Sequence, residues 1–287
     1  MKNNMIASAM LVLAVIFTSC KDDDGVPAPR GTIEEYVVAN DVSEFTQKDS
    51  GIYFRLDTDV EGDLLAGDDV VRFYTSIYSM EDDLLYDGFT NSDEWITSLD
   101  SLSIVVSGMK EALQMMSLGD VATVLIPNEL AYGGYGVLDG KKYVINPYED
   151  IKVVIKPVKV EMTVQEYVDS LGIQDYQTGD DGLIYTIEDG EGTGDLPVNG
   201  QTMSVHYTGM TFERDTFDTS LDNNVPLTFT VGAGYYIKGW ESGLMHFKKG
   251  QKGTLYLPYY LAYGNQSNGS LAPYENLIFD IEVIDIK

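Results

Sequence analysis

Apolar and polar residues alternate at period two through much of the chain, and this alternation predicts short β-strands. The clearest example is 202–208, where Met203, Val205 and Tyr207 fall on one face. Similar runs, rich in β-branched and aromatic residues and bounded by turn-forming Gly, Asp and Asn, lie at 182–187, 225–231, 253–258 and 276–286. The C-terminal hundred residues are therefore predicted to be mainly antiparallel β-structure.

One segment follows helical spacing instead. Trp240, Leu244 and Phe247 stand at i, i+4 and i+7, the positions of one helix face, over 239–247. About five strands with one short helix predict an α+β domain whose antiparallel sheet wraps around that helix. Two more short helices are expected, at 32–44 and 163–175.

The chain also repeats itself at an offset of 131 residues. The matches include Glu35-Tyr36 with Glu166-Tyr167, Asp87 with Asp218, Gly108 with Gly239, Gly119 with Gly250, Pro127 with Pro258, and Ala131-Tyr132-Gly133 with Ala262-Tyr263-Gly264. Tyr74 is matched with Tyr207, two residues out of step. One offset over such a length predicts two tandem copies of one domain. We place them at 49–160 and 181–287, with an acidic tether and short helix at 20–48 and a helical connector at 161–180.

The first residues read as a targeting segment. Lys2 precedes an apolar run, 5–17, that is too short to cross a bilayer as a helix. The run ends in small residues just before Cys20, the one cysteine of the chain. This pattern resembles a bacterial lipoprotein signal at 1–19, which implies a lipid anchor on Cys20. The acidic run 21–24 resembles the tag of Bacteroidetes lipoproteins, so we expect an exported protein at the outer membrane, on its periplasmic or cell-surface face.

The charge balance is strongly acidic. The 46 Asp and Glu residues outnumber the 18 Lys and Arg residues, for a net charge of −28. Such a surface repels phosphate backbones, so nucleic acid is excluded as an expected partner. The sequence has no Walker loop, zinc spacing or serine nucleophile elbow. Asp57 to Gly62 looks like the start of a calcium loop, but Asp68 stands where a bidentate Glu is needed. We expect no metal and no cofactor.

Five motifs occur in order in the second copy: Val205-His-Tyr-Thr-Gly209, Thr216-Phe-Asp-Thr-Ser220, Tyr236-Ile-Lys-Gly-Trp240, Leu261-Ala-Tyr-Gly264 and Leu277-Ile-Phe-Asp280. Together they resemble the FKBP family of macrolide-binding peptidyl-prolyl cis/trans isomerases. The resemblance implies an isomerase acting on Xaa–Pro polypeptides and helping exported proteins fold, with macrolides as inhibitors.

The resemblance also implies roles for individual residues. Trp240 would be the floor of the proline pocket, Asp218 the polar group near the twisting carbonyl, and the Tyr263 hydroxyl a further donor. The remaining pocket residues would be Tyr207, Phe217 and Phe279 as walls and Tyr236, Ile237 and Leu271 at the rim, with the Ile237 N–H holding a substrate carbonyl. Leu227 and Asn223 depart from the family pattern, where an aromatic wall residue and an arginine are common.

Such residue types suit the reaction. Amide resonance sets a barrier of about 18–20 kcal/mol to rotation of the peptide bond, and Xaa–Pro isomers exchange in tens to hundreds of seconds. A dry aromatic cradle that favours the twisted amide lowers the barrier without a nucleophile or metal.

The first copy matches less well. Tyr74, Tyr86-Asp87, Val106 and Tyr132 are expected at pocket positions, but Met109 replaces the floor tryptophan and Val153 replaces a wall phenylalanine. Trp95 is expected in a neighbouring loop. Activity is therefore expected mainly in the second copy. Two alternatives remain open: a non-catalytic FKBP fold that captures proline-containing segments or a partner protein, and a display lipoprotein whose domains are inert spacers.

Overall fold

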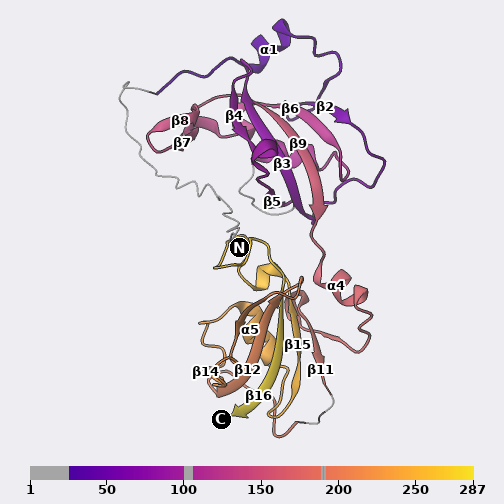
Figure 1. The fold of residues 1–287 in the computed structure, drawn as a ribbon, viewed down its shortest axis with the longest axis vertical. Helices are drawn as coiled ribbons and strands as arrows, with labels where there is room; N and C mark the ends of the chain where they lie inside the picture. The colour runs from indigo at the N-terminus through magenta and orange to yellow at the C-terminus, as the bar shows by residue number, and fades with distance from the viewer. Residues whose placement is uncertain (1–25, 100–105, 189, 191) are drawn as a thin grey trace, which may run out of the picture. The chain divides into compact units, whose positions relative to one another are not determined.

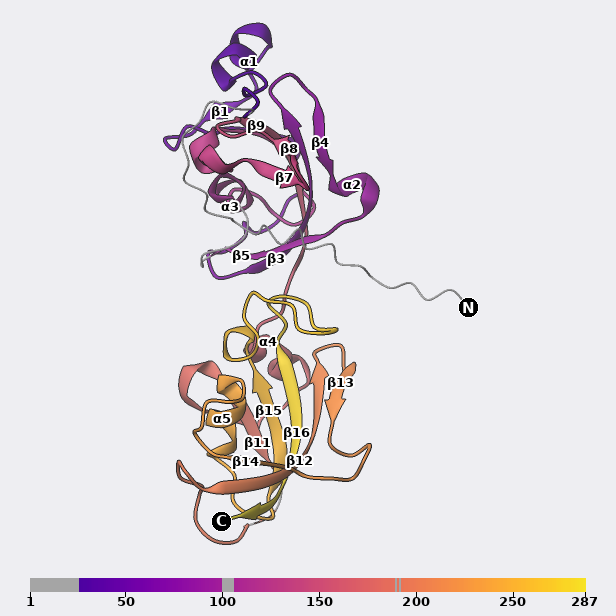
Figure 2. The same ribbon diagram turned by 90° about the vertical axis from the view of Figure 1, so that its left-hand side faces the viewer.

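The chain folds into two compact units, which are described separately. The computed structural model describes residues 26–99, 106–188, 190 and 192–287. Unit 1 runs up to Glu161 and unit 2 begins at Met162 (Figures 1 and 2). The expected signal at 1–19, Cys20 and the acidic run at 21–24 lie outside the described residues. No helix of the described part is long and apolar enough to cross a membrane.

Unit 2 is a curved antiparallel sheet with one helix on each face. Its elements are α4 (Val164–Ser170), β10 (Gln177–Thr178), β11 (Ile184–Ile187), β12 (Thr202–Thr211), β13 (Thr216–Thr219), β14 (Leu227–Thr230), α5 (Lys238–Leu244), β15 (Lys252–Leu257) and β16 (Leu277–Ile286), with 3₁₀ turns η3 (Asp180–Gly182) and η4 (Tyr259–Leu261). The strand order is β10-β11-β15-β16-β12-β13, and β14 also pairs with β12. The predicted fold class is confirmed, and β10 and β13 are the strands that the periodicity did not predict.

Strand alternation divides the side chains of this sheet between two apolar clusters. Leu255 and Leu257 of β15 face α5 in the main core, whereas Tyr256 between them lies in a second cluster with Val164 and Val168 of α4. Because successive strand residues point to opposite faces, α4 must cover the face opposite to α5. The segment expected as a connector is thus packed onto unit 2, and the stacked rings of Tyr167 and Phe212, 4.0 Å apart, add to this contact.

Strand β12 is long enough to pair with two short strands in succession. Opposite Ser204 and Val205, its partner β16 has one extra residue, Ile284, which forms a bulge in the pairing. The first part of β12 pairs with β14, and its later part pairs with β13. A bulge increases local twist, so β13 and β14 follow different halves of one curved strand (Figure 2).

Unit 1 has the same plan. Its elements are α1 (Ile33–Ala39), β1 (Thr46–Gln47), β2 (Tyr53–Thr58), β3 (Val70–Ser79), β4 (Leu84–Asp87), α2 (Gly88–Asn91), β5 (Trp95–Ser98), α3 (Ser107–Leu113), β6 (Val121–Ile126), η1 (Asn128–Leu130), η2 (Gly133–Tyr135), β7 (Val137–Asp139), β8 (Lys142–Ile145) and β9 (Ile151–Val160). The strand order β1-β2-β6-β9-β3-β4, with β5 on β3, repeats that of unit 2. Trp95 therefore lies in a strand, and its expected place in a loop is wrong.

The strand pairing shows that the repeat does not keep one offset. In unit 1, Phe73 lies opposite Trp95 and Pro157. In unit 2, Val205 lies opposite Leu227 and Val283. Phe73 is therefore equivalent to Val205, and β3 is offset by 132 residues from β12. The expected offset of 131 holds for the helices α3 and α5 and for β6 against β15. The last strands differ by 126, because the β7–β8 hairpin makes the preceding connection longer in unit 1.

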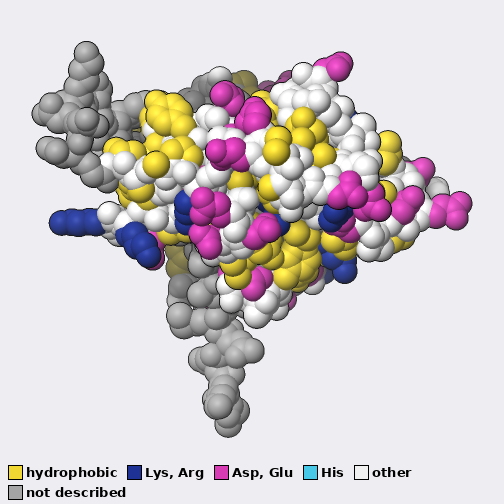
Figure 3. Space-filling view, turned by 90° about the horizontal axis from the view of Figure 1, so that it is seen from above, with side chains coloured by type: hydrophobic (Ala, Val, Ile, Leu, Met, Phe, Trp, Pro, Cys, Tyr) yellow, Lys and Arg dark blue, Asp and Glu magenta, His cyan; other side chains and the backbone are white. Residues whose placement is uncertain are grey.

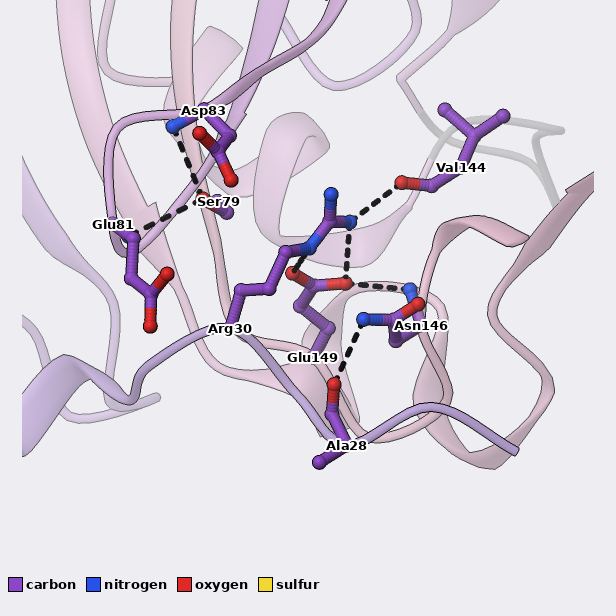
Figure 4. Close-up of polar contacts among 8 residues, drawn as sticks. All are labelled: Ala28, Arg30, Ser79, Glu81, Asp83, Val144, Asn146 and Glu149. Carbon is purple, nitrogen blue, oxygen red and sulfur yellow. Dashed lines mark hydrogen bonds and ion pairs between the residues drawn. The ribbon is translucent and has the colours of Figure 1, made fainter. Parts of the chain in front are cut away.

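The segment before α1 is bound firmly to unit 1. The Arg30 guanidinium donates to both carboxylate oxygens of Glu149, at 2.7 and 2.9 Å, and to the carbonyl oxygen of Val144 at 2.6 Å (Figure 4). The side chain of Glu149 is fully buried. Nearby, the Ile33 N–H donates to Asp150, and the Asn146 amide donates to the Ala28 carbonyl. Residues expected to form a tether thus belong to the packed structure from Ala28 onward.

Candidate active site in unit 2

The helix α5 sits unusually close to the sheet beneath it. A Cβ atom on Gly239 would lie 2.8 Å from a methyl group of Leu257, and one on Gly243 would lie 2.8 Å from methyl groups of Leu255. Glycines four residues apart share one helix face, so this face rests directly on β15. The first turn of α5 then presents Trp240, whose side chain is buried with only 3% of the residue exposed.

Aromatic rings surround Trp240 on several sides. The Trp240 ring centroid lies 5.1 Å from that of Tyr207 and 5.2 Å from that of Phe279, both nearly edge-on. Phe217 in turn packs edge-on against Phe279 at 5.7 Å. These arrangements suit the ring quadrupoles. The four aromatic residues that the sequence selected are therefore brought together, from β12, β13, α5 and β16.

A missing side chain makes room for this cluster. Gly209 of β12 lies opposite Phe279 in the sheet. A Cβ atom at Gly209 would lie 2.7 Å from the Phe217 ring and 2.9 Å from the Phe279 ring. The glycine thus has a packing role here, and the two rings occupy the space above its backbone.

One carboxylate is joined to the aromatic cluster. The Tyr207 hydroxyl donates to Asp218 at 2.6 Å. Burial raises the pKa of Tyr207 above its ordinary value of about 10 and is the largest cause of the shift. The hydrogen bond to Asp218 and the negative charge of that carboxylate raise this pKa further. Tyr207 therefore stays neutral and keeps donating at physiological pH. Asp218 itself is exposed. The Tyr207 hydroxyl orients its carboxylate. The family resemblance led us to expect an arginine in this role, at the position of Asn223.

The rim residues lie at the ends of the loops around the cluster. Tyr236 and Ile237 immediately precede α5, and the Tyr236 ring lies 6.3 Å from that of Trp240. Within the described part of the chain, the Ile237 N–H donates to no protein acceptor. Tyr263 packs at the edge of the core, half-buried, whereas Leu271 is a buried member of it.

Comparison with known proteins agrees with this geometry. The profile of the family described as FKBP-type peptidyl-prolyl cis-trans isomerase matches residues 64–157 and again 194–284. These segments make up more than half of the chain. The chain belongs to the FKBP family of peptidyl-prolyl cis-trans isomerases.

Individual relatives cover one domain's length of the chain. FK506-binding protein 1A of Neurospora crassa is 42% identical over 109 residues, which are 37% of this chain and 90% of that protein. FK506-binding protein 2B of Rhizopus delemar is 42% identical over 91 residues, or 31% of this chain and 44% of that protein. Among solved structures, FkpA from Escherichia coli shows 33% identity over 43% of this chain and 57% of its own, with a TM-score of 0.40.

One aromatic residue of the cluster around Trp240 was missed in the sequence. Phe229 of β14 is buried, and its ring lies 6.0 Å from that of Trp240 and 5.3 Å from that of Tyr236. The alternation of Leu227, Phe229 and Val231 could have identified it, because these residues share one strand face. Phe229 supplies an aromatic wall on the side where Leu227 departs from the family pattern.

Both expected tyrosine and aspartate matches in unit 1 are wrong. Tyr86 lies opposite Ile77 as Asp218 lies opposite Gly209, so Tyr86, not Asp87, takes the aspartate position. By the same register Thr75, not Tyr74, takes the position of Tyr207. A shift of one residue reverses the face of every strand side chain. Asp87 instead caps α2 by accepting from the Thr90 N–H.

Other unit 1 positions agree with the sequence and complete a different interior. Met109 stands where α5 has Trp240, and Val153 stands where β16 has Phe279. Ile77 stands at the position of Gly209, and its side chain is buried. Trp95 takes the position of Leu227 and donates to the Tyr86 hydroxyl at 2.8 Å. Unit 1 therefore has no aromatic ring at the positions of Trp240 and Phe279, and its pair Tyr86 and Trp95 lies at the side.

The described residues contain no group of three or more His, Cys, Asp and Glu side chains placed to hold a metal. The two histidines have structural contacts instead. His206 shares a hydrogen bond with Ser220 at 3.0 Å, and His246 stacks on Tyr185 at 4.4 Å. Neither ring belongs to the aromatic cluster around Trp240.

Proposed function

We propose that unit 2 carries the isomerase activity of this chain, with the aromatic cluster around Trp240 as its binding site and Asp218 beside the twisting bond. The observation that carries the proposal is the cluster itself: four rings from separate elements meet, with a carboxylate fixed by Tyr207 at their edge. A proline ring bound on Trp240 would leave its preceding carbonyl free to rotate. Holding that amide out of plane removes the resonance that resists rotation.

We further propose that unit 1 contributes little turnover. Its Thr75, Ile77, Met109 and Val153 replace Tyr207, Gly209, Trp240 and Phe279, and so remove both the flat floor and the donor to a carboxylate. Methionine is a soft apolar surface that tolerates varied partners. Binding of proline-containing segments without catalysis is therefore the second function to test for this unit.

The test uses the full chain and an Xaa–Pro peptide. The variants Trp240→Ala and Asp218→Ala are expected to lose most of the acceleration, whereas Met109→Ala in unit 1 keeps it. Peptide binding measured in parallel separates the roles, because Asp218→Ala should bind while turning over slowly. Activity that survives Trp240→Ala and disappears with Met109→Ala would assign the catalysis to unit 1 instead. A folded wild-type chain with no acceleration would favour the binding module.

We also propose that the chain is exported, is anchored through a lipid on Cys20, and assists folding of other exported proteins at the outer membrane. The support is the pattern of residues 1–20. Labelled palmitate should be incorporated by bacteria that express the wild-type chain and not by those that express Cys20→Ser. Equal labelling of both chains would contradict the anchor. The names of the relatives further suggest that unit 2 binds a macrolide such as FK506. This binding should be lost in Trp240→Ala.

A further inference from the structure

The loop that leads into α5 is held at its start by backbone hydrogen bonds of Val231 with Gln201 and Gly200, and these do not reach its later residues. It runs from Val231 to Ile237 and includes Gly232 and Gly234, both at positive φ. Two glycines and an alanine in three consecutive positions give the chain wide backbone freedom. Yet this loop must present Tyr236 and the Ile237 N–H at the rim of the site.

A carboxylate from the following helix holds the later part of the loop. Glu241, in the first turn of α5, accepts from the Gly234 N–H with one oxygen at 3.1 Å and from the Tyr236 N–H with the other at 3.2 Å. Hydrogen bonds to an ionised acceptor are stronger than neutral ones. On its other side the loop lies against Asn199, whose side-chain oxygen would be 2.4 Å from a Cβ atom on Gly232.

Unit 1 offers an internal contrast. Helices α3 and α5 begin at equivalent residues, so Lys110 of α3 takes the position of Glu241. A lysine ammonium has three donors and no acceptor, and therefore cannot receive two backbone N–H groups. The residue that holds the loop is present only in the unit that has the aromatic cluster.

We propose that Glu241 is a positioning residue of the isomerase site: it fixes the loop 231–237 so that Tyr236 and the Ile237 N–H meet the substrate in register. It touches the loop backbone and not the substrate. The inference rests on the proposed assignment of activity to unit 2. Because the loop contacts the peptide chain and not the twisting bond, its loss should weaken substrate binding more than the rate of the bound complex.

The test is the full chain with Glu241→Ala, Glu241→Gln and Glu241→Lys, the last reproducing unit 1. We expect KM for an Xaa–Pro peptide to rise about tenfold in Glu241→Ala, equivalent to about 1.4 kcal/mol, with kcat changed less than about twofold. Glu241→Gln keeps one acceptor oxygen and should recover part of the loss. Hydrogen exchange in the segment 231–237 should quicken in Glu241→Ala and Glu241→Lys, while β15 and β16 stay protected.

Ser242→Ala is the matched control, since its hydroxyl bonds only to the Lys238 carbonyl within the same helix. It should leave KM and loop exchange unchanged. Unchanged KM and exchange in Glu241→Ala, with an active wild-type chain, would overturn the inference. A fall in kcat with unaltered KM would also overturn it. An inactive wild-type chain would instead contradict the proposed function, so the two failures are distinguishable.

Discussion

Gly209 shows how one absent side chain can decide what a site contains. Its backbone lies under the rings of Phe217 and Phe279, at distances that leave no room for a methyl group. In unit 1 the equivalent Ile77 is buried, and Val153 stands where Phe279 would be. Gly209 and the two phenylalanines therefore fit together in unit 2. In unit 1 the larger Ile77 is paired with the smaller Val153.

Substituting Gly209 tests this packing. Gly209→Ala should force the two rings apart and cost about 1–3 kcal/mol of unfolding free energy, with a fall in kcat/KM of at least about tenfold as the cluster opens. Urea unfolding and a peptide isomerisation assay measure the two effects. Gly67→Ala is the control, because a Cβ atom there would meet nothing within 4 Å. Normal activity in Gly209→Ala would show that the ring positions are not critical.

The raised pKa of Tyr207 predicts an alkaline loss of stability. Its neutral form is favoured in the fold by burial and by Asp218. The resulting contribution is fully present below the unfolded-state pKa near 10, and it is lost as the pH rises above that value. Unfolding free energy measured from pH 8 to 11 should fall above pH 10. In Tyr207→Phe the slope of unfolding free energy against pH should be smaller, by an amount equivalent to at most one proton released on unfolding. Identical slopes in both chains would contradict the assignment.

At the scale of elements, the two copies share the same devices for placing a helix on the outer face of a sheet. Thr32 and Thr163 each begin a capping box with the glutamate three residues later. Such boxes satisfy two helix N–H groups at once. In unit 1 the segment before the helix is also held by the ion pair between Arg30 and the buried Glu149.

Removing Arg30 should therefore destabilise unit 1. Arg30→Ala leaves the buried Glu149 carboxylate without its cation, which costs about 3 kcal/mol or more. Adding Glu149→Gln should return part of that loss, because the buried charge is then gone. Chemical unfolding followed by tryptophan fluorescence measures both. Lys159→Ala is the control: its half-exposed ammonium shares Glu161 with Arg72, and we expect less than about 1 kcal/mol. Equal effects of the two single variants would argue against a buried-charge cause.

For the whole molecule, the dominant property is charge. Acidic side chains are spread between apolar ones over the face shown in Figure 3, in keeping with the net charge of −28. A field of this sign attracts cationic polypeptides and repels anionic ones. Substrate choice by the full chain should therefore depend on the charge of the residues that flank the proline.

A salt series tests this dependence. At low ionic strength, kcat/KM for a lysine-flanked Xaa–Pro peptide should exceed that for the glutamate-flanked peptide by about tenfold. The ratio should approach one near 0.5 M salt, where the screening length is only about 4 Å. A neutral peptide is the control and should respond little to salt. A ratio that does not change with salt would place the preference in local contacts instead.

The sequence by itself determined the class of fold and the duplication, and it selected the aromatic residues that cluster around Trp240. Alternation in 202–208, the helical spacing of Trp240, Leu244 and Phe247, and the recurrence of Ala-Tyr-Gly are local patterns, so they can be read without coordinates. The identity of the family followed from five ordered motifs and was confirmed.

The tertiary structure decided which residues share a face across strands. An offset that is wrong by one residue exchanges the two faces of a strand, so the sequence matched Asp87 and Tyr74 to positions that belong to Tyr86 and Thr75. The contact of Glu241 with its loop also depends on backbone geometry, because its carboxylate must reach the N–H groups of Gly234 and Tyr236. Pairing registers and backbone hydrogen bonds arise only when the sheet closes around the helix, and no local pattern encodes them.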